Sequence, residues 1–228
     1  MDLTQTIALT MGVAWASGIN LYAAILMLGL MGATGHIVLP PGLESLTNPM
    51  VIGAAGFMYC VEFFADKVPG VDNGWDTLHT FVRIPAGAVL AAGAVGPVSM
   101  EAQIAAALIG GSLAAATHAT KAGGRLILNT SPEPVTNWTA SLCEDIAVIA
   151  GLWAALNYPV VFLVLLGVFV LLMIWLLPKI WRGVVAIFRT IGKWLGLHDG
   201  SPSMVAEATV PAAKDDTAPV AGEPGKQV

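Results

Sequence analysis

Ionisable and polar side chains gather in two segments of this chain, residues 62–83 and 118–145. Elsewhere the sequence is strongly apolar, since only 11% of its 228 residues are charged and the mean hydropathy is +0.76. A charged group in the hydrocarbon core of a membrane costs about 2.5–3.5 kcal/mol on insertion scales and usually marks a functional site. We therefore expect the chemistry of this protein to reside in these two segments.

Helical spacing arranges the polar residues of both segments in stripes, each on one helix face. The stripes are Glu62 and Asp66; Asp72, Asp76, His79 and Arg83; His118, Lys121 and Arg125; and Asn137, Ser141, Glu144 and Asp145. Counted along ideal helices, all four stripes reach a depth of about 6–13 Å from the same membrane surface. The sequence thus predicts one polar layer built from four helices.

The charges of this layer favour a cation, protons included. The acids Glu62, Asp66, Asp72, Asp76, Glu133, Glu144 and Asp145 are seven and the bases Lys67, Arg83, Lys121 and Arg125 are four, so the balance is −3 with His neutral. Unpaired acids near an apolar core either protonate or hold a cation. The alternative is a structural ion-pair network that locks the helices together.

Roles within the layer follow from side-chain chemistry. Glu62, Asp66, Asp76, Glu144 and Asp145 would be cation ligands or proton carriers, with His79 and His118 as relays because imidazole titrates near neutral pH. Arg83, Lys121 and Arg125 would be gates or counter-ions, and Asp72 and Lys67 are secondary candidates. The sequence contains no P-loop, HExxH or nucleophile-elbow motif, so no catalytic residue, metal or cofactor is assigned.

A polar interruption, Ser17–Gly18–Ile19–Asn20, lies near the middle of the first apolar stretch. It could unwind a helical turn and expose carbonyl groups to an ion. It could equally be a small-residue packing notch in which Asn20 bonds to a neighbouring helix. Asn20 is therefore a further secondary candidate.

Six apolar stretches are long enough to form membrane-spanning helices, since about 20 helical residues cross a core of about 30 Å. They are residues 7–30, 49–67, 75–95, 103–123, 137–156 and 160–177. The predicted fold is an all-α, polytopic membrane helix bundle within residues 1–178.

Lys and Arg follow the second, fourth and sixth stretches, whereas the other connections contain none. The positive-inside rule then places both termini and both polar segments on the cytoplasmic side of the inner membrane. Residues 179–197 are predicted to form a basic amphipathic helix on anionic lipid, and residues 198–228 a disordered tail. A sequence pI near 5.2 argues against nucleic acid as a partner.

Two further patterns concern symmetry and packing. Residues 65–70 (ADKVPG) resemble residues 119–124 (ATKAGG), which suggests a two-fold internal repeat as in many transporters. Gly53, Gly56, Gly110 and Gly111 permit close helix contacts, within one copy or between copies of a homo-oligomer.

Four motifs resemble the DUF4126 family of small, mostly bacterial integral membrane proteins. They are EFFADKVPGVD at 62–72, HTFVR at 79–83, NTSPEP at 129–134 and SLCED at 141–145. The resemblance extends over residues 5–160, and it implies a multi-pass inner-membrane protein but no particular activity.

Three functions remain open. The surplus of acid favours a small transporter or channel for a cation or a proton-coupled solute, working through the polar layer in the cytoplasmic third of the bundle. A structural or accessory subunit would use the layer for cohesion and the basic helix for docking. An interfacial enzyme acting on a phosphorylated lipid would use Asp72, Asp76 and His79 beside Lys121 and Arg125.

Overall fold

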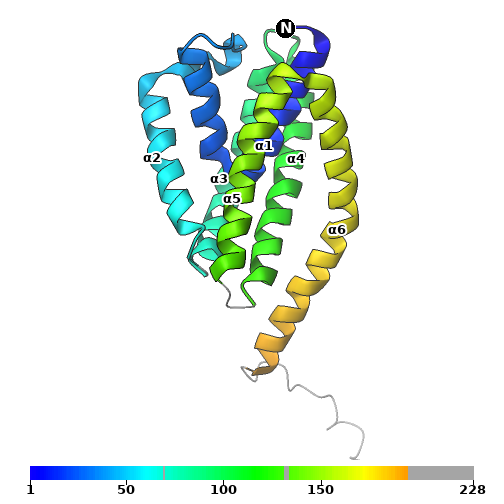
Figure 1. Ribbon diagram of the computed structural model, residues 1–228. Coiled ribbons are helices and arrows are strands. Elements are labelled where there is room, and N and C mark those ends of the chain that lie inside the picture. The colour runs from blue at the N-terminus through cyan, green and yellow to red at the C-terminus, as the bar shows by residue number, and fades with distance from the viewer. Residues whose placement is uncertain (69, 131–133, 195–228) are drawn as a thin grey trace, which may run out of the picture. The chain divides into compact units, whose positions relative to one another are not determined.

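The computed structural model describes residues 1–68, 70–130 and 134–194, and these are helical apart from short connections (Figure 1). The elements are α1 (Leu3–Ala33), the 3-10 helix η1 (Pro41–Thr47), α2 (Pro49–Ala65), α3 (Val71–Val95), α4 (Met100–Leu128), α5 (Pro134–Asn157) and α6 (Pro159–Trp194). The chain divides into two compact units, Met1–Phe188 and Arg189–Val228, and the bundle belongs to the first. The predicted all-α class is confirmed.

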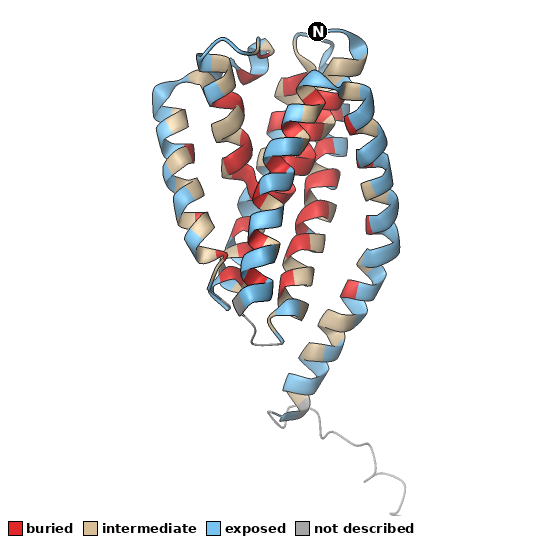
Figure 2. Ribbon diagram, in the orientation of Figure 1, coloured by how far each residue is buried: buried red, intermediate tan, exposed pale blue. Residues whose placement is uncertain are grey.

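Five helices in the described residues are long and apolar enough to cross a membrane, or six if η1 and α2, bent by 70°, count as one span. Polar caps set where these helices begin: Asn48 accepts a hydrogen bond from the Met50 amide before α2, and Ser99 accepts one from the Ala102 amide before α4. The outer faces of α2, α5 and α6 are mostly exposed and apolar, as lipid contact requires (Figure 2). The protein is therefore a multi-pass membrane protein, as predicted.

The first helix does not run straight through the bundle. Asn20 has the extended backbone angles φ −145° and ψ 95°, so α1 consists of two half-helices that meet there. Both ends of α1 lie at the same end of the bundle, because Met1 and Thr6 line one cavity together with Val38 and Leu39 (Figure 1). The helix thus enters the bundle, turns at Asn20 and returns to the side from which it came.

This bend corrects the predicted topology. The N-terminus lies at what we call the N-terminal end, with η1 and the connection between α3 and α4. The turn at residues 66–68, the end of α4 and the start of α5 form the opposite end, which we call the polar end (Figure 1). The prediction that the N-terminus shares a side with both polar segments is therefore wrong, because α1 was taken as a full span.

Small residues let the other helices approach α1 and one another. A Cβ added at Gly18 would lie 2.6 Å from the Ala114 carbonyl oxygen, and one at Gly110 would lie 2.3 Å from the Ala91 Cβ. By contrast, a Cβ at Gly53 would meet nothing within 4 Å. The predicted close contacts thus occur at Gly110 and not at Gly53, within one copy.

The local structure differs from two other predictions, the internal repeat and a separate helix after Pro178. Residue 65 ends α2 and residues 66–68 lie in a turn, whereas residues 119–124 lie inside α4, so the described parts of these two segments are not equivalent parts of a repeat. Pro178 lies inside α6 and does not end it, so residues 179–194 continue the last helix rather than starting a new one. Their placement on lipid stays a prediction, and residues 195–197 and the tail 198–228 lie outside the described residues.

Candidate functional site

The predicted polar side chains converge in the half of the bundle nearest the polar end. Those that are buried are Asn20, Glu62, Asp66, Asp72, Asp76, His79, Arg83, His118, Lys121, Arg125, Asn137, Ser141 and Asp145. Glu144 is partly exposed, with a side-chain exposure of 22%. We call these fourteen residues the polar layer. Of the other residues predicted for the layer, Lys67 stands apart from it and Glu133 lies outside the described residues.

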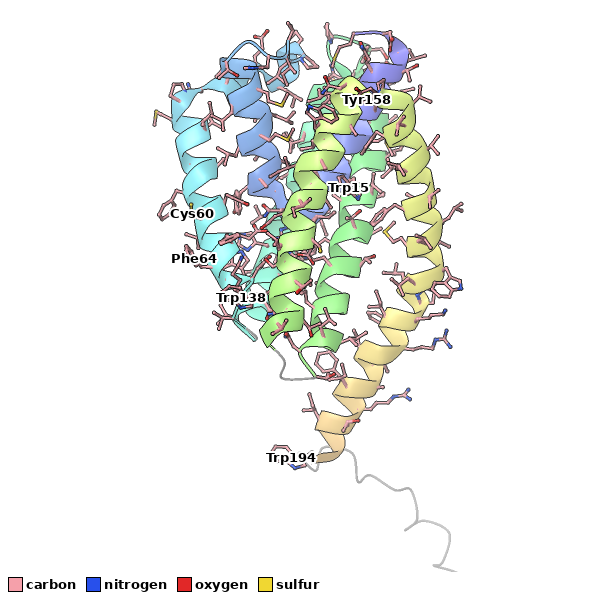
Figure 3. The ribbon with its side chains drawn as sticks, viewed as in Figure 1. Trp15, Cys60, Phe64, Trp138, Tyr158 and Trp194 are labelled. Carbon is pink, nitrogen blue, oxygen red and sulfur yellow. The ribbon has the colours of Figure 1, made fainter. Side chains whose placement is uncertain are left out.

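Lys67 faces outward from the end of α2. Its ammonium nitrogen lies 2.9 Å from the centroid of the Phe63 ring and donates a hydrogen bond to the Phe63 carbonyl. Burial lowers the pKa of this ammonium group. On the same helix, Phe64 and Cys60 point away from the bundle (Figure 3). Lys67 therefore acts at the surface of the bundle and holds no carboxylate of the polar layer.

Arg83 joins α3 to α2. One guanidinium nitrogen, Nη2, lies 2.6 Å from Glu62 Oε1, and the other, Nη1, lies 3.1 Å from Asp76 Oδ1. The side chains of Arg83 and Glu62 are fully buried. Removing one member of such a pair leaves an uncompensated buried charge, so this contact holds the lower part of α2 against α3.

Arg125 joins α4 to α5 and to the end of α2. Its Nε and Nη2 donate to the two oxygens of Glu144 at 3.2 and 2.7 Å, a bidentate pair. Its Nη1 donates to Asn137 Oδ1 at 2.7 Å and to the Asp66 carbonyl at 3.0 Å. Every nitrogen of this guanidinium is thus occupied.

Lys121 lies at the centre of the polar layer. Its ammonium nitrogen approaches four carboxylates: Asp66 at 3.0 Å, Glu144 at 3.4 Å, Glu62 at 3.6 Å and Asp76 at 3.8 Å. It also donates a hydrogen bond of 3.0 Å to the Ile19 carbonyl. Three helices and the tip of α1 therefore meet around one ammonium group.

The bend at Asn20 explains how the Ile19 carbonyl becomes available. In a continuous helix the Ala23 amide would bond to that carbonyl. Instead the Ala23 amide donates to Asn20 Oδ1 at 2.9 Å, so Asn20 caps the second half-helix of α1. The Asn20 Nδ2 donates to Asp145 Oδ1 at 2.9 Å. Both alternatives for this segment are thus realised: it exposes a carbonyl and it bonds to a neighbour.

The partners of His118 hold it as a neutral ring, whereas those of His79 fit either a neutral or a protonated ring. His118 Nδ1 faces the Arg83 Nη1 donor at 3.3 Å and must accept, while its Nε2 lies 2.8 Å from Thr80 Oγ1 and 3.1 Å from the Asp76 carbonyl and must donate. His79 Nδ1 donates to the Trp75 carbonyl, and its Nε2 lies 3.0 Å from the Tyr22 hydroxyl, which can donate or accept. A second proton on His118 would break its contact with Arg83, so this geometry does not favour the relay role for His118.

Asp72 has a local structural role. Its Oδ1 accepts from the Gly70 amide at 2.8 Å, which fixes the turn before α3. Asn129 Nδ2 donates to both of its oxygens at 2.9 and 2.8 Å and so ties the end of α4 to that turn. Asp72 and Asn129 therefore close the polar end of the bundle.

Several buried polar atoms of the layer have no hydrogen-bond partner. They are Glu62 Oε2, Asp66 Oδ1, Asp76 Oδ2, Asp145 Oδ2, Ser141 Oγ and Arg83 Nε. Six acids (62, 66, 72, 76, 144 and 145) face three bases (83, 121 and 125), so the layer carries −3 with both histidines neutral. Among the described residues no group of His, Cys, Asp or Glu is arranged as a ready-made metal site.

One comparison with known protein families finds a match. A family model described as "Domain of unknown function (DUF4126)" matches residues 7–179. The chain belongs to the DUF4126 family. No curated protein and no solved structure matches it. Membership of DUF4126 therefore confirms the resemblance drawn from the four motifs, and the chemistry of the site rests on its geometry.

Three groups at the site escaped prediction from the sequence. The Ile19 carbonyl is not among them, because an unwound turn that exposes carbonyl groups was one of the two alternatives for residues 17–20. Tyr22 and Thr80 are uncharged partners of the two histidines. Asn129 was part of the NTSPEP motif, and its spacing from the charged stripes gave no hint of its contact with Asp72.

Proposed function

We propose that this DUF4126 protein is a small secondary transporter or channel for a cation, with protons as carried or coupled ions. The polar layer is its ion-binding region. We assign Glu62, Asp66, Asp76, Glu144 and Asp145 as the groups that exchange protons or cations, and Arg83 and Arg125 as the fixed counter-charges that hold the helices in place.

One observation carries this proposal: the buried layer contains three more acids than bases, and four of its carboxylates have an oxygen without a partner. An unpaired ionised carboxylate in a low-dielectric interior carries an effective penalty of several kcal/mol. The surplus must therefore be held as bound protons or as a bound cation. A layer needed only for cohesion has no use for that surplus.

A cavity supports access to the layer. It has a volume of about 220 Å³ and is bordered by Ile19, Lys121, Gly124, Arg125, Glu144 and Phe169. Glu144 is the one carboxylate of the layer with appreciable exposure. An ion entering here would meet Glu144 first and the buried acids behind it.

The test is flux in proteoliposomes that hold the full-length protein. A gradient of Na⁺, K⁺ or NH₄⁺ is imposed, and internal pH and cation content are followed with indicator dyes. We expect flux in the wild type and its loss, by tenfold or more, in the Glu62→Gln, Glu144→Gln double variant. The matched control is Glu101→Gln, which removes an exposed carboxylate at the start of α4. Flux that survives the double variant unchanged contradicts the proposal.

The cohesive role is the second candidate, and a specific observation favours it: each of the three bases in the layer contacts at least two carboxylates. If cohesion were the whole function, replacing Glu62 and Arg83 together by Gln and Met would leave activity in the cell intact. Partner proteins that remain bound to such a variant would support an accessory subunit.

The geometry gives less support to a lipid-phosphate enzyme. Such an enzyme needs basic groups free to bind phosphate, and both Lys121 and Arg125 are occupied by carboxylates. Asp72 is fully buried and fixes a turn. Hydrolysis of a phosphorylated lipid by the purified protein would support this alternative function.

We further infer a bacterial inner membrane with the polar end on the cytoplasmic side, because the positive-inside rule applies to the Lys and Arg residues found there. The N-terminus would then lie on the outer side. Exposed Lys179 and Arg182 support contact of α6 with anionic lipid.

A further inference from the structure

The oxygens around Lys121 are arranged as a cage. Three helices supply the four carboxylates, with Glu62 and Asp66 on or beside α2, Asp76 on α3 and Glu144 on α5. The tip of α1 supplies a fifth oxygen, the Ile19 carbonyl. Such convergence on a single ammonium group exceeds what one ion pair needs.

The Ile19 carbonyl is an independent sign of a cation site. It lies at the C-terminal end of a half-helix, where the helix dipole places partial negative charge. Carbonyls freed by broken helices coordinate cations in the middle of many transporters. Here Asn20 frees the carbonyl by taking over the Ala23 amide, so the sequence maintains a break that serves Lys121.

Unsatisfied acceptors near the cage point the same way. Glu62, Asp66 and Asp76 each keep one buried oxygen without a partner, although their other oxygens face Lys121. The hydroxyl of Ser141, 1% exposed, lies one helical turn before Asp145 and has no partner at all. The side chains therefore offer more oxygen than the ammonium group uses.

The distances indicate the class of cation. Oxygens at 3.0–3.8 Å from the nitrogen suit an ammonium-sized ion. Mg²⁺ requires about 2.0–2.1 Å and Ca²⁺ about 2.3–2.6 Å, both far shorter. The cage thus fits a large monovalent cation.

Lys121 also has space into which to move. Its side chain borders the 220 Å³ cavity next to Glu144 and Phe169, so the ammonium group has open space beside the cage. A free cation entering in its place would exchange one positive charge for another. The charge of the cage would then remain the same.

We propose that Lys121 acts as a tethered cation in a binding site for a monovalent cation of ammonium or potassium size, formed by Glu62, Asp66, Asp76, Glu144 and the Ile19 carbonyl. This deepens the proposed function, since it names the substrate class of the polar layer. In transport, the free cation and the Lys121 ammonium group occupy the cage alternately.

The experiment removes the tether and supplies the cation. Full-length Lys121→Ala protein is purified in detergent, and its thermal unfolding midpoint is measured in NH₄Cl, KCl, NaCl and choline chloride at equal ionic strength. We expect ammonium and potassium to raise the midpoint saturably, by roughly 5 °C well above the dissociation constant, relative to choline. The wild type and Lys67→Ala should show no such difference between salts, because their cage is already filled. Equal behaviour of Lys121→Ala in all four salts overturns the proposal.

A second variant covers the case in which Lys121→Ala does not fold. Asp66→Asn together with Lys121→Ala keeps the charge of the layer at −3 and retains an amide oxygen at position 66. It should show the same selective stabilisation. If neither variant yields folded protein in any of the salts, free cations do not refill the cage and the proposal is overturned.

Flux measured on the same preparations separates this proposal from the previous one. Selective stabilisation of Lys121→Ala without flux in the wild type would support the cation cage and contradict the transport function. Flux in the wild type without any selective stabilisation of the variants would support transport and contradict the cage.

Discussion

Asn20 and Asp145 lie 125 positions apart in the sequence and meet through one hydrogen bond of 2.9 Å at the tip of α1. The same Asn20 caps the second half of that helix. One amide side chain therefore both shapes the bend and attaches it to α5, and its loss should affect stability and function together.

Replacing Asn20 by Leu should destabilise the protein by about 1–3 kcal/mol, because it removes a cap and leaves a buried Asp145 oxygen without its donor. Thermal unfolding in detergent measures this. Asn48→Leu is the matched control, since Asn48 caps α2 at an exposed position and contacts no carboxylate. A smaller loss for Asn20 than for Asn48 would show that the bond to Asp145 contributes little.

Removing the Arg83 guanidinium should cost about 3–5 kcal/mol, since it leaves Glu62 and Asp76 buried with only the more distant Lys121 as a shared counter-charge. In a double-mutant cycle, Glu62→Gln combined with Arg83→Met should recover much of that loss. The free energy of unfolding of the four proteins gives the coupling directly. Additive effects would mean that the 2.6 Å contact is not energetically coupled.

His118→Gln should leave the pH profile of cation flux unchanged between about pH 6 and pH 8, because the ring is already held neutral by Arg83 and the Asp76 carbonyl. Gln can supply both an acceptor and a donor in its place. A loss of pH dependence in this range would assign proton transfer to His118 after all.

Alanine at Gly110 should destabilise the bundle by about 1–3 kcal/mol, because its Cβ would overlap that of Ala91 at 2.3 Å. Gly53→Ala makes the same chemical change in open space and should be neutral or slightly stabilising. The thermal unfolding midpoints of the two variants are compared in one detergent. A lower midpoint for the Gly110 variant alone shows that helix packing, and not the helix propensity of alanine, sets the effect.

Protease accessibility should show that the N-terminus and the polar end lie on opposite sides of the membrane. A protease site inserted after Met1 should be cut from the outer side in spheroplasts, whereas one inserted near Lys67 should be protected there. Cleavage of both sites from the same side would contradict the returning path of α1 and indicate that this helix crosses the membrane completely.

Helical spacing alone was enough to assemble the polar layer, because stripes such as Asp72, Asp76, His79 and Arg83 depend only on local geometry and on a common depth. The ends of most helices could also be predicted from the sequence, since Pro and Gly mark most of the connections. What it could not supply was the path of α1. The residues of its two halves are equally apolar, so hydropathy cannot distinguish one crossing from a descent and a return.

The pairing within the layer was similarly out of reach. Glu62 pairs with Arg83, and Asp66 pairs with Lys121. These pairings depend on how α2, α3 and α4 are rotated relative to one another, and no pattern in a single sequence encodes that rotation. The neutral state of His118 depends on these same neighbours. Gly53 meets no neighbour within one copy, so a close contact there between copies stays a prediction.

The returning path of α1 has a consequence for how the molecule is made. The tip of this helix is held by Lys121 and Asp145, which the ribosome adds a hundred residues or more after Asn20. The first thirty residues therefore have no polar partners when they leave the ribosome, and they reach their final place only after α4 and α5 have entered the bilayer. Biogenesis of this protein should end, rather than begin, with its N-terminal helix.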